Sequence, residues 1–177
     1  MHSPRGCLSV LFAKLRKGPE LRDYLGLRWP TRKELFIWTV GLLGLMVASD
    51  CLTVALGRPI VPEIMVEVYR NTSFLPILWL GMFIGAPLSE EILFRGFLFR
   101  GLCESRIGGI GTVFLTAGLW ASIHIQYDAY GIATILASGI VLGLARLKSG
   151  SVPLCMVMHG MMNLLATLEI SIFFPDS

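Results

Sequence analysis

Long apolar stretches separated by short polar or glycine-rich turns run through most of the chain. A helix that spans a membrane needs about 20 mostly apolar residues, and fewer where protein surrounds it. Five stretches meet this condition, and we expect a helix in each of them: Leu35–Leu56, Phe74–Leu102, Ile110–Ile125, Tyr130–Leu147 and Val152–Phe174. The pattern therefore predicts an all-α fold, a polytopic membrane helix bundle of about five transmembrane helices.

The segments between these stretches are typical of turns. Residues 57–73, GRPIVPEIMVEVYRNTS, contain two prolines and mixed charge, which indicates a loop with a short helix at the membrane surface. Pro87 lies inside the second apolar stretch, and proline breaks a helix or starts a new one. We therefore expect a break at GAPLSEE, with Glu90 and Glu91 in the first turn of the segment that follows.

Composition supports a membrane protein. The chain has 177 residues, of which 54% are apolar and only 15% are charged, and its mean hydropathy is +0.70. A soluble domain carries about 25% charged residues, so an ordinary soluble protein is excluded. The length allows one domain.

The net charge of +3 is small, but basic residues gather before the first apolar stretch. The residues concerned are Arg5, Lys14, Arg16, Lys17, Arg22, Arg28, Arg32 and Lys33, against Glu20 and Asp23. No nucleic-acid-binding motif accompanies them, so anionic lipid is the expected partner and nucleic acid is not. We expect residues 1–33 to form a basic cytoplasmic N-terminal segment and residues 34–177 to form the membrane domain.

Lys and Arg favour the cytoplasmic side of a membrane. With five spans, three basic regions fall on one side: the N-terminal segment, the region of Arg95, Arg100 and Arg106, and the turn of Arg146 and Lys148. The QYDA turn and the final PDS carry no Lys or Arg. We therefore expect the N-terminus to be cytoplasmic and the C-terminus to lie outside. The loop with Arg58 and Arg70 is the one departure from this rule.

Two adjacent acids and a base stand out in the second stretch, in SEEILFR. An ionisable side chain at membrane depth costs roughly 2.5–3.5 kcal/mol on insertion scales and usually faces a bundle interior or a cavity. Glu91 and Arg95 are four residues apart, so they share a helix face and can pair. Glu90 is rotated by about 100° from Glu91. Glu90 therefore needs a partner from elsewhere, such as water or an imidazole.

Two histidines occur in later apolar stretches. His124 ends the third, four residues after Trp120, and His159 lies in the fifth, four residues before Asn163. Glu90 and His124 together can bind and deprotonate a water molecule. His159 and Asn163 share a helix face, and both side chains can donate hydrogen bonds to a developing oxyanion.

Each feature alone also has a structural interpretation. Glu91 and Arg95 can be a structural ion pair, His124 an interfacial histidine, and His159 with Asn163 an interhelical contact. Trp120 is expected to serve packing rather than chemistry. These interpretations lose weight together, because nearly every strongly polar side chain at depth falls into these few spacings.

The quoted segments resemble a known family. EEILFR, WASIH and HGMMN are similar to the EExxxR, FxxxH and HxxxN motifs of the CAAX protease and bacteriocin-processing (CPBP/Abi) family, which lie on successive core helices. The resemblance covers residues 87–165, and APLSEEILFRGFLFRGL resembles the family throughout. The departure is Trp120, where phenylalanine is usual.

The resemblance implies an intramembrane endopeptidase of the glutamic type without a cofactor. By position, Glu90 and His124 would activate water, and His159 and Asn163 would form the oxyanion hole. Glu91 and Arg95 would support this site. The implied substrate is a membrane-associated protein or peptide, cleaved in a leader or a C-terminal tail. Short loops resemble the prokaryotic members, which implies a multi-pass protein of a bacterial inner membrane.

Other functions remain open at this stage. Glu90, His124 and His159 could supply ligands to zinc, although HExxH is missing. Cys155 lies four residues before His159 and could act as a nucleophile. A non-catalytic binding, immunity or scaffold module of the same fold, and a proton relay, are further alternatives.

Overall fold

The structure is a computed structural model that describes residues 20–174. All regular secondary structure in that range is helical, as expected. The elements are α2 (Leu21–Leu25), α3 (Arg32–Ala55), α4 (Glu63–Arg70), α5 (Leu75–Leu80), the π-helical segment η1 (Gly81–Gly85), α6 (Ala86–Glu91), the π-helical segment η2 (Ile92–Leu98), α7 (Phe99–Cys103), α8 (Gly108–Ser122), α9 (Ala129–Ser149) and α10 (Val152–Phe173). His2 and the basic residues up to Lys17 lie outside the described residues, as does the PDS tail.

Four of the five expected spans are helices long and apolar enough to cross a membrane. They are α3, the continuous helix Leu75–Cys103, α9 and α10. The fifth, α8, is apolar but has only 15 residues, or about 22 Å at 1.5 Å per residue. The predicted fold class, a polytopic membrane helix bundle, is confirmed.

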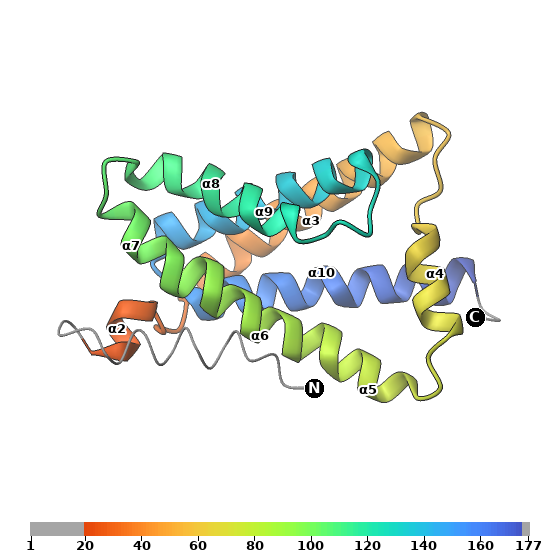
Figure 1. Cartoon of the computed structure of the whole chain (residues 1–177), viewed down its shortest axis with the longest axis horizontal. Coiled ribbons are helices and arrows are strands. Elements are labelled where there is room, and N and C mark those ends of the chain that lie inside the picture. The colour runs from red at the N-terminus through yellow and green to blue at the C-terminus, as the bar shows by residue number, and fades with distance from the viewer. Residues whose placement is uncertain (1–19, 175–177) are drawn as a thin grey trace.

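The long helices alternate in direction along the bundle (Figure 1). One end gathers the start of α3, the α7–α8 turn and the α9–α10 turn. The opposite end carries α4, the α8–α9 turn and the end of α10. The regions that the sequence marked as basic therefore share one end of the bundle, apart from residues 1–19, which are not described.

Short polar side chains set where three of these helices begin. Thr31 forms a capping box with Glu34, in which each side chain accepts a hydrogen bond from the other residue's backbone N–H. Asp128 accepts from the Gly131 N–H at the start of α9, and Ser151 accepts from the Leu154 N–H at the start of α10. The hydrogen bond from the Gly131 N–H, and to a smaller extent the Arg58 guanidinium, hold the pKa of the Asp128 carboxyl below its usual value.

The second apolar stretch differs from the expected break. Leu75–Cys103 is one continuous helix, and Glu90 and Glu91 lie in its middle rather than at a new N-terminus. A π-helical turn, η1, ends at Gly85, two residues before Pro87, and the Ala86 N–H bonds to the Gly81 carbonyl five residues back. The wider turn accommodates the missing proline N–H without ending the helix. The expectation that Glu90 and Glu91 lie in the first turn of a new helical segment is therefore wrong.

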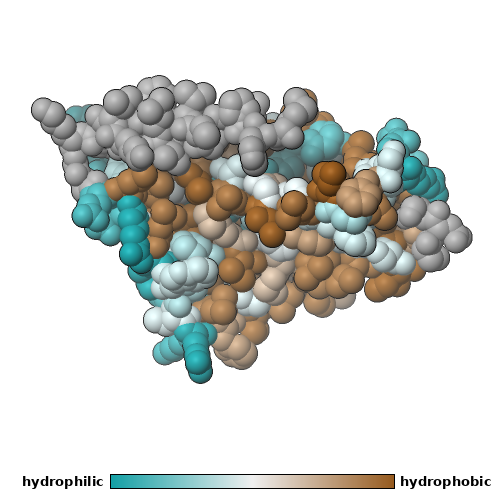
Figure 2. Space-filling model, turned by 90° about the horizontal axis from the view of Figure 1, so that it is seen from below, coloured by the Kyte–Doolittle hydropathy of each residue, from teal (hydrophilic) through white to brown (hydrophobic). Residues whose placement is uncertain are grey.

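The surface fits a lipid environment. Figure 2 shows hydrophobic side chains over the middle of one face and hydrophilic ones toward its ends. Phe36, Val47, Ile77 and Ile172 are each more than half exposed. Apolar side chains that face outward over the length of a helix are expected where the solvent is hydrocarbon.

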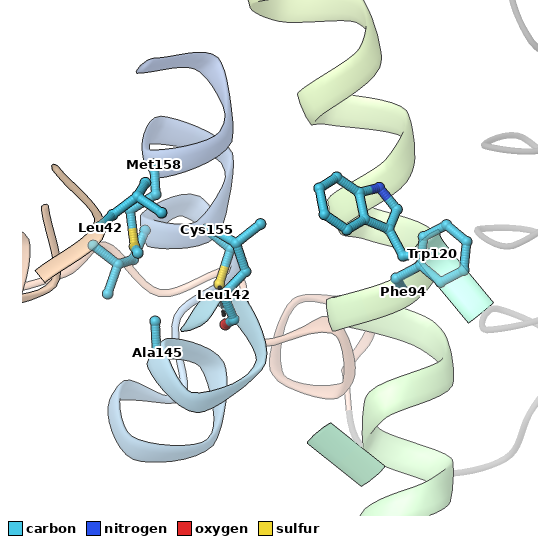
Figure 3. Packing of buried hydrophobic residues seen from close by; sticks show 8 residues of the cluster. Leu42, Phe94, Trp120, Leu142, Ala145, Cys155 and Met158 are labelled. Atoms are coloured by element: carbon cyan, nitrogen blue, oxygen red, sulfur yellow. Dashed lines mark hydrogen bonds between the residues drawn. The ribbon is translucent and has the colours of Figure 1, made fainter. Parts of the chain in front are cut away.

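The core lies between the helices that carry the motifs. Leu42, Leu142, Ala145 and Met158 pack against one another, and the same cluster includes Phe94 and Trp120 (Figure 3). α8 approaches α9 closely because α9 has glycines at the contact: a Cβ on Gly139 would lie 3.0 Å from the Trp120 ring. Small residues at helix contacts are typical of membrane bundles. This packing fixes α8, and hence Trp120, against α9.

Candidate active site

Glu91 is the buried centre of an ionic network. Its side chain has no exposed surface, and its Oε1 accepts hydrogen bonds from Arg95 Nη1 at 3.1 Å and from His159 Nδ1 at 3.0 Å. The expected pairing of Glu91 with Arg95 is therefore present, and His159 is a third member of the group. The other carboxylate oxygen, Oε2, is buried without a partner among the described residues. The network links η2 to α10.

Arg95 makes contacts with three helices, although its Nε is buried without a hydrogen-bond partner among the described residues. It is fully buried, and its Nη2 donates to the Gly139 carbonyl in α9 at 3.2 Å. Its guanidinium carbon lies 4.8 Å from the centre of the Trp120 ring, which is a cation–π contact. An arginine presents several donors in a planar fork, so it can bind a carboxylate and a carbonyl together. Arg95 thereby fixes Glu91 relative to α9.

Trp120 connects the groups that the sequence analysis singled out. Its indole Nε1 donates to Glu90 Oε2 at 2.6 Å. Its ring meets the His124 ring edge-on, with centroids 5.1 Å apart, and the His159 ring edge-on at 5.2 Å. The indole is nearly fully buried. Glu90, His124 and His159, from three separate parts of the chain, therefore surround one side chain.

Within residues 20–174 no hydrogen bond uses the second oxygen of Glu90, Oε1, and none joins Glu90 to His124 directly. Glu90 is half-buried. One carboxylate oxygen is thus fixed by Trp120 and the other is open to a small molecule such as water.

His124 has a defined tautomer in this arrangement. It lies just after the end of α8, and its Nδ1 is 2.8 Å from the backbone carbonyl of Trp120. A carbonyl only accepts, so Nδ1 carries a hydrogen, and in the neutral ring Nε2 keeps its lone pair. A neutral imidazole oriented in this way is able to accept a proton at Nε2.

Next to His124, the Tyr127 ring lies 6.3 Å away between centroids. Burial raises the pKa of the Tyr127 phenol, so that side chain stays neutral.

His159 and Asn163 lie on one face of α10, as expected. Asn163 Nδ2 donates to the Met82 carbonyl at 2.7 Å. That carbonyl is left over by the π turn, because the Ala86 N–H bonds to Gly81 and Pro87 has no N–H. One amide hydrogen of Asn163 is therefore engaged with η1, and the second remains for another acceptor.

A polar pocket opens near this site. It has a volume of ≈ 520 Å³ and lies between the end of α3, α4 and the start of α9. Its lining includes Asp50, Arg58, Glu67, Tyr127 and Tyr130. Tyr127 lines this pocket and lies beside His124, with ring centroids 6.3 Å apart, whereas His124 itself is not part of the lining.

The other chemistries considered from sequence have less support. In the described part of the chain, no three His, Cys, Asp or Glu side chains come together as a metal site. Cys155 is buried, and its thiol contacts the Leu142 and Ser151 carbonyls. A buried thiol that contacts two backbone carbonyls does not have the surroundings of a reactive thiolate.

Sequence reasoning missed three contributions to the site. Trp120 was expected to serve packing, yet it is also a hydrogen-bond donor to Glu90. Gly139 and Met82 contribute backbone carbonyls that hold Arg95 and Asn163. The spacing of Trp120 four residues before His124 was the one available signal, since a backbone carbonyl leaves no trace in a residue pattern.

Comparison with known proteins supplies the family. The profile described as type II CAAX prenyl endopeptidase Rce1-like matches residues 72–165, just over half of the chain. The chain is also 31% identical over 130 residues to a protein of Escherichia coli described as an uncharacterized 24.3 kDa protein. That alignment covers 69% of this chain and 58% of the relative, so the chain spans less than two thirds of the relative's length. No solved structure matches.

The matched region contains all six motif residues and extends from just before α5 into α10. The resemblance expected from EEILFR, WASIH and HGMMN is thereby confirmed. The chain belongs to the family described as type II CAAX prenyl endopeptidase Rce1-like.

Proposed function

We propose that this protein is an intramembrane endopeptidase of the glutamic type. The observation that carries the proposal is the convergence of Glu90, His124 and His159 on Trp120, next to a buried Glu91–Arg95 pair. Family membership supports a membrane protease. A structural ion pair alone would not need an open carboxylate oxygen and an oriented imidazole beside it.

In the proposed reaction, a water molecule binds between Glu90 Oε1 and His124 Nε2. One of these groups removes a proton as the water oxygen attacks the carbonyl carbon of the scissile peptide bond. The tetrahedral intermediate then collapses, and the same proton passes to the leaving nitrogen. The products are a carboxylic acid and an amine, so no other reactant is consumed.

His159 and Asn163 are proposed to stabilise the oxyanion. The Asn163 amide has one hydrogen free for this role. His159 donates through Nδ1 to Glu91, so donation through Nε2 requires the doubly protonated ring. The Glu91 carboxylate supplies a counter-charge for that ring. Removing one oxyanion donor in other hydrolases lowers kcat by about 10²–10³.

The proposed substrate is a membrane-associated protein or peptide, cleaved in a leader or a C-terminal tail. The polar pocket beside Tyr127 offers a route for water and for a polar part of the substrate. The proposed location is a bacterial inner membrane, with residues 1–33 on the cytoplasmic side and residues 34–177 as the protease domain. No cofactor is proposed.

The test compares protein termini in membranes that contain the wild-type chain, Glu90→Gln or Asn163→Ala. We expect new termini with the wild type, a loss of at least 10³-fold with Glu90→Gln and about 10²-fold with Asn163→Ala. Arg100→Met serves as a control, because Arg100 is exposed and its ion pair among residues 20–174 is with Glu104. A peptide that copies the new terminus then provides a quenched fluorescent substrate for the purified protein.

Cleavage that persists in both variants would contradict the assignment of the site. Identical termini with the wild type and with an empty membrane, at equal expression, would instead favour a non-catalytic module. Loss of cleavage after treatment with a metal chelator would favour the zinc alternative.

A further inference from the structure

Arg146 is a buried cation outside the three motifs. It lies in α9 with 7% of its surface exposed, and no carboxylate among the described residues forms an ion pair with it. Its Nε donates to the backbone carbonyl of Arg95 at 2.7 Å, and its guanidinium carbon is 5.6 Å from the centre of the Phe99 ring. Arg146 lies in the last turn of α9, yet its side chain is buried in the protein rather than exposed at the membrane surface.

The Arg95 carbonyl is available because of the second π-helical segment. At the end of η2 the Phe99 N–H bonds to Phe94, five residues back, instead of to Arg95. When the helix returns to α-helical spacing, one carbonyl is skipped. Arg146 satisfies the skipped carbonyl, as Asn163 does for Met82 in η1.

The opposite side of Arg146 meets the segment that precedes the first span. A Cβ on Gly26 would lie 2.5 Å from Arg146 Nη2 and 2.8 Å from the Gly150 carbonyl, so the backbone runs directly against the guanidinium. The same segment is bound to the α9–α10 turn: the Val152 N–H donates to Gly26, and the Ser151 hydroxyl donates to the Arg28 carbonyl.

We propose that Arg146 is a positioning residue for the candidate active site. It holds the backbone of Arg95 in the π-helical register, and this register directs the Arg95 guanidinium at Glu91. Glu91 in turn holds His159 through Nδ1. Arg146 touches no reacting atom in the proposed mechanism, so it acts through Arg95. The catalytic consequence rests on the proposed function, whereas the structural link can be measured without it.

The first experiment needs no substrate. The full chain, labelled with ¹⁵N-histidine in lipid nanodiscs, gives a signal from the His159 Nδ1–H that is donated to Glu91. We expect Arg146→Met to shift or broaden this signal and Arg146→Lys to restore it in part, because lysine can still donate to the Arg95 carbonyl. Arg100→Met, an exposed arginine on the same helix as Arg95, should leave it unchanged. An unchanged signal in Arg146→Met would overturn the inference, whether or not the protein is a protease.

The second experiment measures turnover of the fluorescent peptide described above. Arg146→Met is expected to lower kcat at least tenfold and to leave KM within twofold. In an Arg95→Met background the same change should cause no further loss, since its effect passes through Arg95. The proposal would be overturned if the double variant loses the product of the two single losses in kcat, or if Arg146→Met changes KM alone. An inactive wild type would contradict the proposed function instead.

Misfolding of Arg146→Met is addressed by a second variant. Gly26→Ala retains the guanidinium, but the new Cβ would meet Nη2 and the Gly150 carbonyl at a position with a left-handed φ of 70°, so the segment and the guanidinium must both shift. We expect the same shift of the His159 signal and the same fall in kcat. If Gly26→Ala folds and matches the wild type in both the His159 signal and kcat, the proposal fails.

Discussion

Trp120 shows how one side chain can organise a site without carrying its chemistry. The indole donates to Glu90, lies edge-on to two imidazoles and faces the Arg95 guanidinium. Each contact limits the rotamers of a neighbouring group. The usual family residue at this position, phenylalanine, retains the ring but has no donor. Replacing Trp120 with phenylalanine therefore separates the contribution of the hydrogen bond from that of the aromatic surface.

Trp120→Phe is expected to lower turnover of the fluorescent peptide about tenfold. A hydrogen bond to a charged group contributes about 1.5–3 kcal/mol, and tenfold corresponds to about 1.4 kcal/mol of barrier. Thermal unfolding should change little, because the ring still fills most of the space against Gly139. Trp120→Leu removes both contributions and should lower both turnover and the unfolding temperature. A Phe variant as inactive as Glu90→Gln would contradict this division.

The residue-scale predictions succeeded where helix geometry alone decides the outcome. The pairing of Glu91 with Arg95, and the different direction of Glu90, follow from spacing within one helix. The partner of Glu90 could not be predicted, since it depends on how α8 packs against the second long helix. The same holds for His159, whose Nδ1 partner lies 68 residues earlier in the chain.

At the scale of elements, the two π-helical segments explain why the second long helix carries so much of the site. Each skips one carbonyl, and each skipped carbonyl binds a polar side chain from a later helix: Asn163 for Met82 and Arg146 for Arg95. In hydrocarbon, an unsatisfied backbone group costs several kcal/mol. The π turns therefore determine which helices must pack against the site and in which register.

Gly160→Ala tests the contact between η1 and α10. A Cβ at Gly160 would lie 2.9 Å from the Phe83 carbonyl oxygen, so the helices would have to separate. We expect a loss of about 1–3 kcal/mol in the free energy of unfolding, as for other overpacked cores. A separation here also draws Asn163 away from Met82, so peptide turnover should fall as well.

Gly118→Ala in α8 is the matched control, because a Cβ there meets nothing within 4 Å. Its unfolding free energy should stay equal or rise by up to about 1 kcal/mol, the difference in helix propensity. Equal stability of the two variants, measured by thermal unfolding in one detergent, would show that η1 and α10 are less closely packed than described.

The sequence located the helices better than it described their interior. Apolar length predicted α3, α9 and α10 to within a few residues, because hydrocarbon thickness sets the length of a span. Pro87 was expected to end a helix, and a π turn accommodated it instead. The choice between a break and a π turn depends on whether another helix satisfies the skipped carbonyl, and Asn163 lies 76 positions after Pro87 in the printed sequence.

At the scale of the whole molecule, the alternating helices place two short turns at opposite ends (Figure 1). The α7–α8 turn shares its end with the start of α3 and with Lys148. The α8–α9 turn shares the other end with α4 and contains Asp128. Although α8 is short, it still connects the two ends. The candidate site lies toward this second end, because His124 and Tyr127 belong to the α8–α9 turn.

The positive-inside tendency then predicts which end faces the cytoplasm. Basic residues of the described chain gather at the first end, and only Arg58 and Arg70 belong to the second. We expect the α7–α8 turn to be cytoplasmic and the α8–α9 turn, with the polar pocket, to face outward. Water and substrate would then reach the proposed site from the outer side of the membrane.

Two single-cysteine variants in a cysteine-free background test this orientation. Ser105→Cys lies in the α7–α8 turn and Gln126→Cys in the α8–α9 turn, and both positions are exposed. A membrane-impermeant maleimide added to intact spheroplasts should label Gln126→Cys at once and Ser105→Cys only after the membrane is permeabilised. The reverse pattern would place the pocket in the cytoplasm, so the proposed cleavage would act on cytoplasmic termini. Equal labelling of both turns before permeabilisation would contradict an odd number of crossings between them.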